Sequence, residues 1–255
     1  MSKKTNIAII GDSFGDDKGC WPHRWSDVGP GWPELLSKNP DYSVENLSEG
    51  GASFWYCYQK FLGIYKDFDQ IIFMVTQPGR LTKFIPNFSE GAPAYKHHPN
   101  LEQVLRWKKL VIEKNRISEA LINLEAIENY FLYVKNDEYD EHVQWLFVEK
   151  IKRLKPNTVI VPCFYDSIKT LTTTPLCEVG HNELIQLHDG LDLKKIYKKL
   201  QDDGRSDARK CHMSEENNYV FYRLMLKFLQ GVPVQINPNI FFRPSKKLDH
   251  YWRFD

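Results

Sequence analysis

The chain of 255 residues is 42% hydrophobic and 14% aromatic, which excludes a disordered chain and a miniprotein stapled by disulfides. Its 34 Lys and Arg residues against 33 Asp and Glu residues leave a formal net charge of +1. So small a charge creates no overall field that would attract nucleic acid or an anionic membrane. We therefore expect a folded protein that binds neither.

The cysteines and the apolar segments indicate the cellular compartment. The five cysteines are odd in number and widely scattered, unlike the closely spaced set of a secreted disulfide framework. The apolar run at residues 7–10 is too short for a signal peptide, and no stretch approaches the roughly 18 apolar residues of a membrane span. We expect a soluble protein of the cytoplasm.

Four short apolar runs predict β-strands. Residues 6–10, 70–75 and 158–162 form the clearer candidates, and residues 42–47 a weaker one. Helical stretches lie between the candidates, which favours a parallel sheet with crossover helices. The predicted fold class is α/β: a three-layer α/β/α sandwich, flavodoxin-like, with a mainly parallel sheet of about five strands.

The block from about residue 100 to residue 155 is predicted to be a helical insertion. Residues 101–134 carry an apolar stripe at helical spacing without Gly or Pro, and residues 142–154 repeat the pattern before Pro156. We expect one domain over residues 1–230 that includes this insertion. Residues 231–255, with three Pro and five aromatic residues, would form a C-terminal arm.

The first predicted strand ends in Gly11-Asp12-Ser13, a sequence that suits an exposed serine. A serine hydroxyl acts as a nucleophile where a turn exposes it, a base lies within reach and backbone N–H groups face the developing oxyanion. A strand end followed by small residues offers that setting. All three residues also favour turns for ordinary reasons, so a plain turn is the alternative.

A second glycine cluster, with Gly50 and Gly51, follows the second predicted strand. Glycines let the backbone approach a ligand closely, and residues 54–65 behind them are predicted to form a helix whose first amides could face an anion. This combination suits an oxyanion hole. A strand-to-helix turn that binds nothing is the alternative.

His212 precedes an apolar helix predicted over residues 219–229. Ser214 is a natural N-cap with Glu215 and Glu216 behind it, which places His212 in the loop at the helix entrance. From there an imidazole is free to reach across a cleft. A surface or structural role without chemistry is the alternative.

Together these three elements resemble the SGNH, or GDSL-type, esterase and lipase superfamily. In that family a Gly-Asp-Ser motif carries the nucleophile, a Gly and an Asn after the next two strands help bind the oxyanion, and Asp-x-x-His supplies the base. The resemblance implies an SGNH-hydrolase-like fold with Ser13 as nucleophile, Gly51 in the oxyanion hole and His212 as base. The segment around Trp32 also looks like the family's Trp-bearing first helix.

The chain departs from the family pattern in two places. Thr76 and Gln77 follow the third strand where the family has Gly-x-Asn-Asp, so either would substitute for the oxyanion-binding Asn. Arg209 stands three residues before the histidine in place of Asp, and Asp207 is the candidate replacement. Asp12, beside the nucleophile, joins the substrate-binding set. Without replacements, one missing oxyanion donor costs about 10²–10³ in rate and a misoriented histidine about 10⁴.

Other motifs indicate neither a metal nor a cofactor. No Cys-x-x-Cys or His-Glu-x-x-His spacing is present, and the sequence from Gly11 to Gly15 lacks the Gly-Lys-Ser/Thr ending of a phosphate-binding loop. We therefore expect no metal site and no cofactor.

Three functions fit these observations. The leading one is a serine esterase that removes a small acyl group, acetyl above all, from a carbohydrate or a similar polar ester. The second is an O-acyltransferase that uses the same site with a sugar hydroxyl in place of water. The third is a catalytically inactive SGNH-like binding or structural protein, favoured by the missing Asn and Asp.

Overall fold

The strands in the described part of the chain run parallel and form one sheet. The computed structural model describes residues 4–16, 31–50, 52–76, 78, 104–105, 108–109, 112–113, 119–163 and 215–232, apart from the side chains of 119–123 and 215–216. Within these ranges the strands are β1 (Thr5–Ile10), β2 (Tyr42–Asn46), β3 (Gln70–Val75) and β4 (Val159–Pro162). Their order across the sheet is β2-β1-β3-β4.

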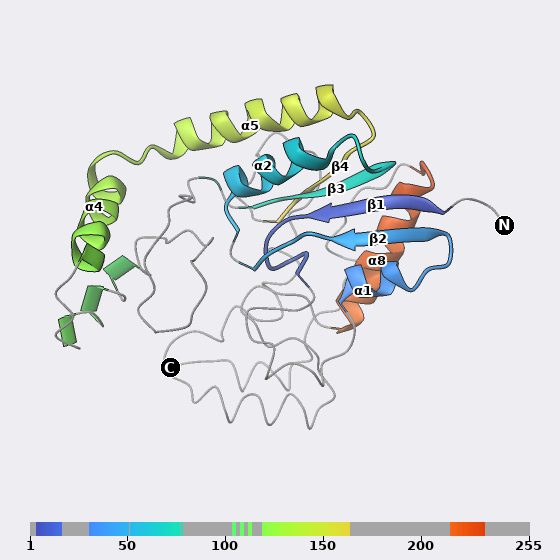
Figure 1. Ribbon diagram of the computed structural model, residues 1–255, viewed down its shortest axis with the longest axis horizontal. Coiled ribbons are helices and arrows are strands. Elements are labelled where there is room, and N and C mark those ends of the chain that lie inside the picture. Colours follow the sequence, from blue (N-terminus) through green and yellow to red (C-terminus); the bar gives the residue numbers. More distant parts are fainter. Residues whose placement is uncertain are drawn as a thin grey trace, which may run out of the picture.

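Helices cover both faces of this sheet (Figure 1). One face carries α1 (Trp32–Ser37) and α8 (Glu215–Leu229), and the other carries α2 (Phe54–Ile64) and α5 (Asp137–Leu154). The two inner strands are buried from both sides, which explains why β1 and β3 are continuous apolar runs instead of alternating ones.

Two apolar cores hold the layers together. On the first face Ile9 packs with Trp32 and Phe221, whose rings meet edge to face at a centroid distance of 5.1 Å. On the second face Ile10 packs with Phe61 of α2 and Ile151 of α5. Because successive strand residues point to opposite faces, neighbours such as Ile9 and Ile10 serve different cores.

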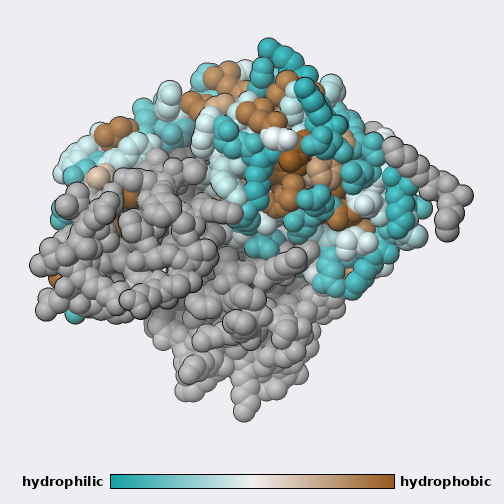
Figure 2. Space-filling model, viewed as in Figure 1, coloured by the Kyte–Doolittle hydropathy of each residue, from teal (hydrophilic) through white to brown (hydrophobic). Residues whose placement is uncertain are grey.

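The helical block between β3 and β4 contains α4 (Glu119–Tyr133) and α5. Asn136 caps α5, since its side chain accepts a hydrogen bond from the Tyr139 N–H at 3.0 Å. Val148 and Ile151 lie in the second core, so α5 is the crossover helix that returns the chain from β3 to β4. Figure 2 shows apolar residues among polar ones over α2 and α5, where Leu62 and Leu146 are exposed.

The predicted fold class is confirmed: this is an α/β/α sandwich with a parallel sheet. The described residues contribute four strands, where about five were expected. Their order matches the start of the flavodoxin-like order 2-1-3-4-5. Among the helices of these ranges, none is long and apolar enough to span a membrane. The division into a domain at 1–230 and an arm at 231–255 remains a prediction.

Candidate functional site

The topology brings the ends of β1 and β3 together at the centre of the sheet. β1 pairs with β2 on one side and with β3 on the other. The chain therefore changes its direction across the sheet between β2 and β3. Open α/β sheets bind their ligands at the carboxyl ends of the strands beside such a switch point. Ser13 follows β1 and Thr76 follows β3, so both leave the sheet at the edge where a ligand is expected.

Asp12 shapes the turn that carries Ser13. The Asp12 carbonyl oxygen accepts hydrogen bonds from the N–H groups of Gly15 at 3.0 Å and Asp16 at 3.1 Å. Its carboxylate Oδ1 accepts a third from the Phe14 N–H at 3.1 Å, and the side chain is fully buried. These contacts make Asp12 a structural support of the turn.

Ser13 itself is half-buried. Within the described part of the chain, neither its N–H nor its hydroxyl makes a hydrogen bond. The turn can pass close to β3 because residue 11 is glycine: a Cβ there would lie 2.4 Å from the Met74 Cβ. A serine placed in this way suits a nucleophile, and that role for Ser13 remains a prediction.

Trp32 joins this turn to the helices of the first face. Its indole N–H donates to the Phe14 carbonyl oxygen at 2.8 Å, and its backbone N–H donates to Asn218 Oδ1 at 3.1 Å. Trp32 is fully buried, and its indole contact is shielded from water, whereas the backbone contact to Asn218 is partly buried. Because Asn218 lies in the first turn of α8, the start of α8 is tied through one residue to the Ser13 turn.

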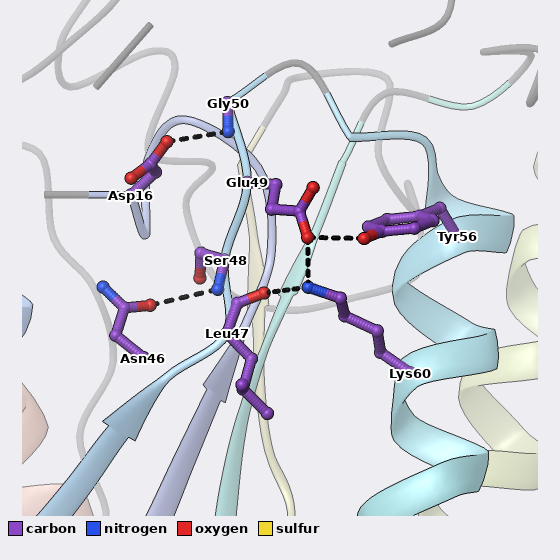
Figure 3. A network of polar contacts seen from close by, with 8 residues as sticks. All are labelled: Asp16, Asn46, Leu47, Ser48, Glu49, Gly50, Tyr56 and Lys60. Atoms are coloured by element: carbon purple, nitrogen blue, oxygen red, sulfur yellow. Dashed lines mark hydrogen bonds and ion pairs between the residues drawn. The ribbon is translucent and has the colours of Figure 1, made fainter. Parts of the chain in front are cut away.

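The loop after β2 is bonded to the Ser13 turn. Asn46 Nδ2 donates to the Gly15 carbonyl oxygen at 2.7 Å. The Gly50 N–H donates to Asp16 Oδ2 at 2.9 Å, and this contact is visible in Figure 3. The two loops therefore lie side by side, as the oxyanion prediction for the neighbouring Gly51 requires.

Glu49 connects the same loop to β1 and to α2. Its N–H donates to the Gly11 carbonyl oxygen at 3.0 Å. Its carboxylate Oε1 accepts hydrogen bonds from the Tyr56 hydroxyl and the Lys60 ammonium group, and Lys60 also donates to the Leu47 carbonyl oxygen at 2.8 Å (Figure 3). Backbone and side chain of Glu49 are thus held from opposite sides.

Gln144 of α5 reaches the end of β3. Its Nε2 donates to the Thr76 carbonyl oxygen at 2.7 Å, and only 2% of the residue is exposed. Thr76 is fully buried as well. The crossover helix therefore fixes the backbone at the point where β3 gives way to the predicted oxyanion segment.

Three of the predicted site residues lie in the described ranges. Asp12 and Ser13 share one turn, and Thr76 lies at the end of the strand beside it. The other predicted residues, Gly51, Gln77, Asp207 and His212, lie outside the described residues, and their roles remain predictions.

Sequence reasoning missed the residues that position this edge of the sheet: Asn46, Glu49, Lys60 and Gln144. Asp16 belongs to this group as well, because its carboxylate accepts the Gly50 N–H. A single buried Gln among the many polar residues of a helix carries no sequence signal of its own. Asn46, at a strand end before glycines, could have been suspected as a turn residue.

No metal cluster stands out in this part of the molecule: the described ranges contain no group of three or more His, Cys, Asp or Glu side chains placed to hold an ion. Cys57 and Cys163 are buried in the two apolar cores.

No protein-family model matches the sequence, and no curated protein sequence matches it. Among solved structures, a catalytic mutant of Axe2, an acetylxylan esterase from Geobacillus stearothermophilus, is 12% identical and aligns over 93% of this chain and 99% of its own, with a TM-score of 0.31. LAE5, an α/β hydrolase enzyme from the metagenome of Lake Arreo, Spain, is 11% identical over 64% of this chain and 78% of its own, with a TM-score of 0.24. Likenesses this weak carry no functional argument, so the function proposed below rests on this chain's own residues.

Proposed function

We propose that the chain is a serine esterase that removes a small acyl group, such as acetyl, from a carbohydrate or a similar polar ester. The observation that carries this proposal is the double contact of Trp32 with the Ser13 turn and with Asn218 of α8. His212 precedes the start of α8 by three residues, which span at most roughly 11 Å. This short distance along the chain supports the choice of His212 as the base that would serve Ser13.

In the proposed reaction Ser13 Oγ attacks the acyl carbonyl carbon while His212 takes the hydroxyl proton. The Ser13 and Gly51 amides, with Thr76 or Gln77, stabilise the oxyanion. The carbon–oxygen bond to the alcohol then breaks, and His212 returns the proton to the alcohol. Water attacks the acyl-enzyme in the same way and releases the acid, which restores Ser13.

Asp207 or a backbone carbonyl would orient the imidazole, because the third member of a triad orients and stabilises without acting as the base. The buried Asp12 supports the turn. Its contact with the substrate stays a prediction.

A fluorophosphonate probe tests the proposal directly, because it reacts only with an activated hydroxyl. We expect it to label the wild-type protein at Ser13, and Ser13→Ala to lose labelling and roughly 10⁴–10⁶ of the turnover of p-nitrophenyl acetate. Ser37→Ala, which changes an exposed serine at the end of α1, serves as the matched control and should behave as wild type.

The same measurements separate the alternatives. An acetylated sugar that yields free acetate supports the esterase, whereas transfer of acetyl to an added sugar acceptor would favour the acyltransferase. A folded wild-type protein that the probe does not label would overturn the proposal in favour of an inactive binding protein.

A further inference from the structure

The polar contacts around Glu49 suggest a role that the proposed reaction leaves unassigned. We call Glu49, Tyr56 and Lys60 the Glu49 cluster. Tyr56 and Lys60 are four residues apart on α2 and so lie on one face of that helix. Figure 3 shows both side chains directed at the Glu49 carboxylate from the helix.

The cluster is anchored to a rigid element. The Ser53 side chain caps α2 by accepting a hydrogen bond from the Tyr56 N–H at 3.2 Å, and Phe54, Cys57 and Phe61 are buried in the second core. A helix held in this way has little freedom to shift. Its Tyr56 hydroxyl is therefore a fixed point for whatever it binds.

Lys60 holds the loop at two places. Its ammonium group donates to the Leu47 carbonyl oxygen at 2.8 Å and pairs with Glu49 Oε1. The side chains of Lys60 and Glu49 are only 25% and 30% exposed, so water screens this pair less than a surface pair. One ammonium group thus fixes both the exit of β2 and the residue two positions later.

The backbone on both sides of Gly51 is held. The Gly50 N–H is bonded to Asp16, the Glu49 N–H is bonded to Gly11, and the Ala52 N–H donates to the Glu49 carbonyl oxygen at 3.0 Å. The Glu49 cluster adds the only contacts of this loop to α2 made through ionised side chains within the described residues. An oxyanion hole needs its donors fixed before charge develops.

From this geometry we propose that Glu49 and Lys60 are positioning residues that fix the loop bearing the oxyanion-binding amide of Gly51. The inference rests on the proposed function, because it assigns the loop an oxyanion to bind. Neither residue touches the substrate. Their removal should therefore weaken the stabilisation of the tetrahedral intermediate more than the binding of the ester.

Lys60→Met is the first test, because it removes the ammonium group and keeps the apolar stem. We expect kcat for p-nitrophenyl acetate and the rate of fluorophosphonate labelling to fall about 10- to 100-fold, below the loss of a whole oxyanion donor. KM should change less than about twofold, whereas affinity for a trifluoromethyl ketone, which forms a tetrahedral adduct, should fall in parallel with kcat. Lys60→Arg, which restores charge and donors, should recover most of the loss.

Lys38→Met is the matched control. It removes an ammonium group that pairs with Glu34 at 2.6 Å on α1, where the two side chains are 63% and 45% exposed. We expect this variant to keep wild-type kinetics. If Lys60→Met fails to fold, Glu49→Gln takes its place with the same expected pattern.

The outcomes separate this inference from the proposed function. A wild-type protein that the probe does not label overturns the proposed function, and the inference with it. Labelled wild type together with folded Lys60→Met and Glu49→Gln variants that react at the wild-type rate overturns the inference alone. A parallel rise in KM, with unchanged affinity for the ketone, would also overturn it.

Discussion

At the scale of single residues, the Ser13 turn depends on close packing between two loops. Gly15 lies so near Ser48 that a Cβ on Gly15 would be 2.4 Å from Ser48 Oγ and 3.0 Å from Ser48 Cβ. Among the described residues, the buried Ser48 Oγ has no hydrogen-bond partner, so the packing argument here rests on its shape. Residue 15 must therefore be small for the two loops to meet.

Gly15→Ala tests this packing. We expect it to lower the free energy of unfolding by about 1–3 kcal/mol, because the new methyl group has no space. Ser48→Gly removes the obstacle, so a double-mutant cycle in urea denaturation should give a favourable coupling free energy of roughly 1 kcal/mol between the two changes. A coupling of zero would mean that the two residues do not obstruct each other.

At the scale of secondary-structure elements, Gln144 links α5 to the end of β3. Gln144→Leu keeps a similar volume and removes a buried hydrogen bond of 2.7 Å to the Thr76 carbonyl oxygen. We expect the free energy of unfolding to fall by about 1–3 kcal/mol. Gln59→Leu makes the same chemical change at an exposed position of α2 and should alter it by less than about 0.5 kcal/mol.

Urea denaturation followed by circular dichroism measures both variants. The rate of labelling at Ser13 adds a second readout, because a shifted β3 end would move the predicted oxyanion segment. Equal stability of the Gln144 and Gln59 variants would contradict a supporting role for Gln144.

The elements themselves were largely predictable from the sequence. The strand predicted at residues 70–75 matches β3, and the other three agree with their strands to within one residue. The start of α5 was placed five residues late, at 142 instead of Asp137. Its first turn carries three acidic residues and no apolar stripe, so the signal lay in the Asn136 cap and in charges that suit a helix N-terminus.

The candidate site was predictable only in part. A strand followed by Gly11-Asp12-Ser13 indicated the turn, because each of these residues has a local reason to lie there. The contacts that join the loops, such as Asp16 with Gly50 or Asn46 with Gly15, pair residues more than thirty positions apart. Such pairing follows from the strand order, which local patterns do not encode.

At the scale of the whole molecule, Trp32 joins the turn that carries Ser13 to helix α8. It packs on Phe221 of α8, donates from its backbone to Asn218 and donates from its indole ring to Phe14. The Ser13 turn and the helix that follows the proposed base therefore contact the same buried side chain. Loss of the Trp32 indole N–H should lower both the free energy of unfolding and the reactivity of Ser13.

Trp32→Phe keeps an aromatic ring against Phe221 and removes the hydrogen bond of 2.8 Å to the Phe14 carbonyl oxygen. We expect the free energy of unfolding to fall by at least about 2 kcal/mol, because a buried acceptor loses its donor and a smaller ring leaves a cavity. Trp55→Phe, at a position 46% exposed, is the control and should change it by less than about 0.5 kcal/mol. Fluorophosphonate labelling of the folded Trp32→Phe variant should slow, because the Ser13 turn loses its anchor to α8. Labelling at the wild-type rate, with stability equal to that of Trp55→Phe, would mean that the Ser13 turn is held without Trp32.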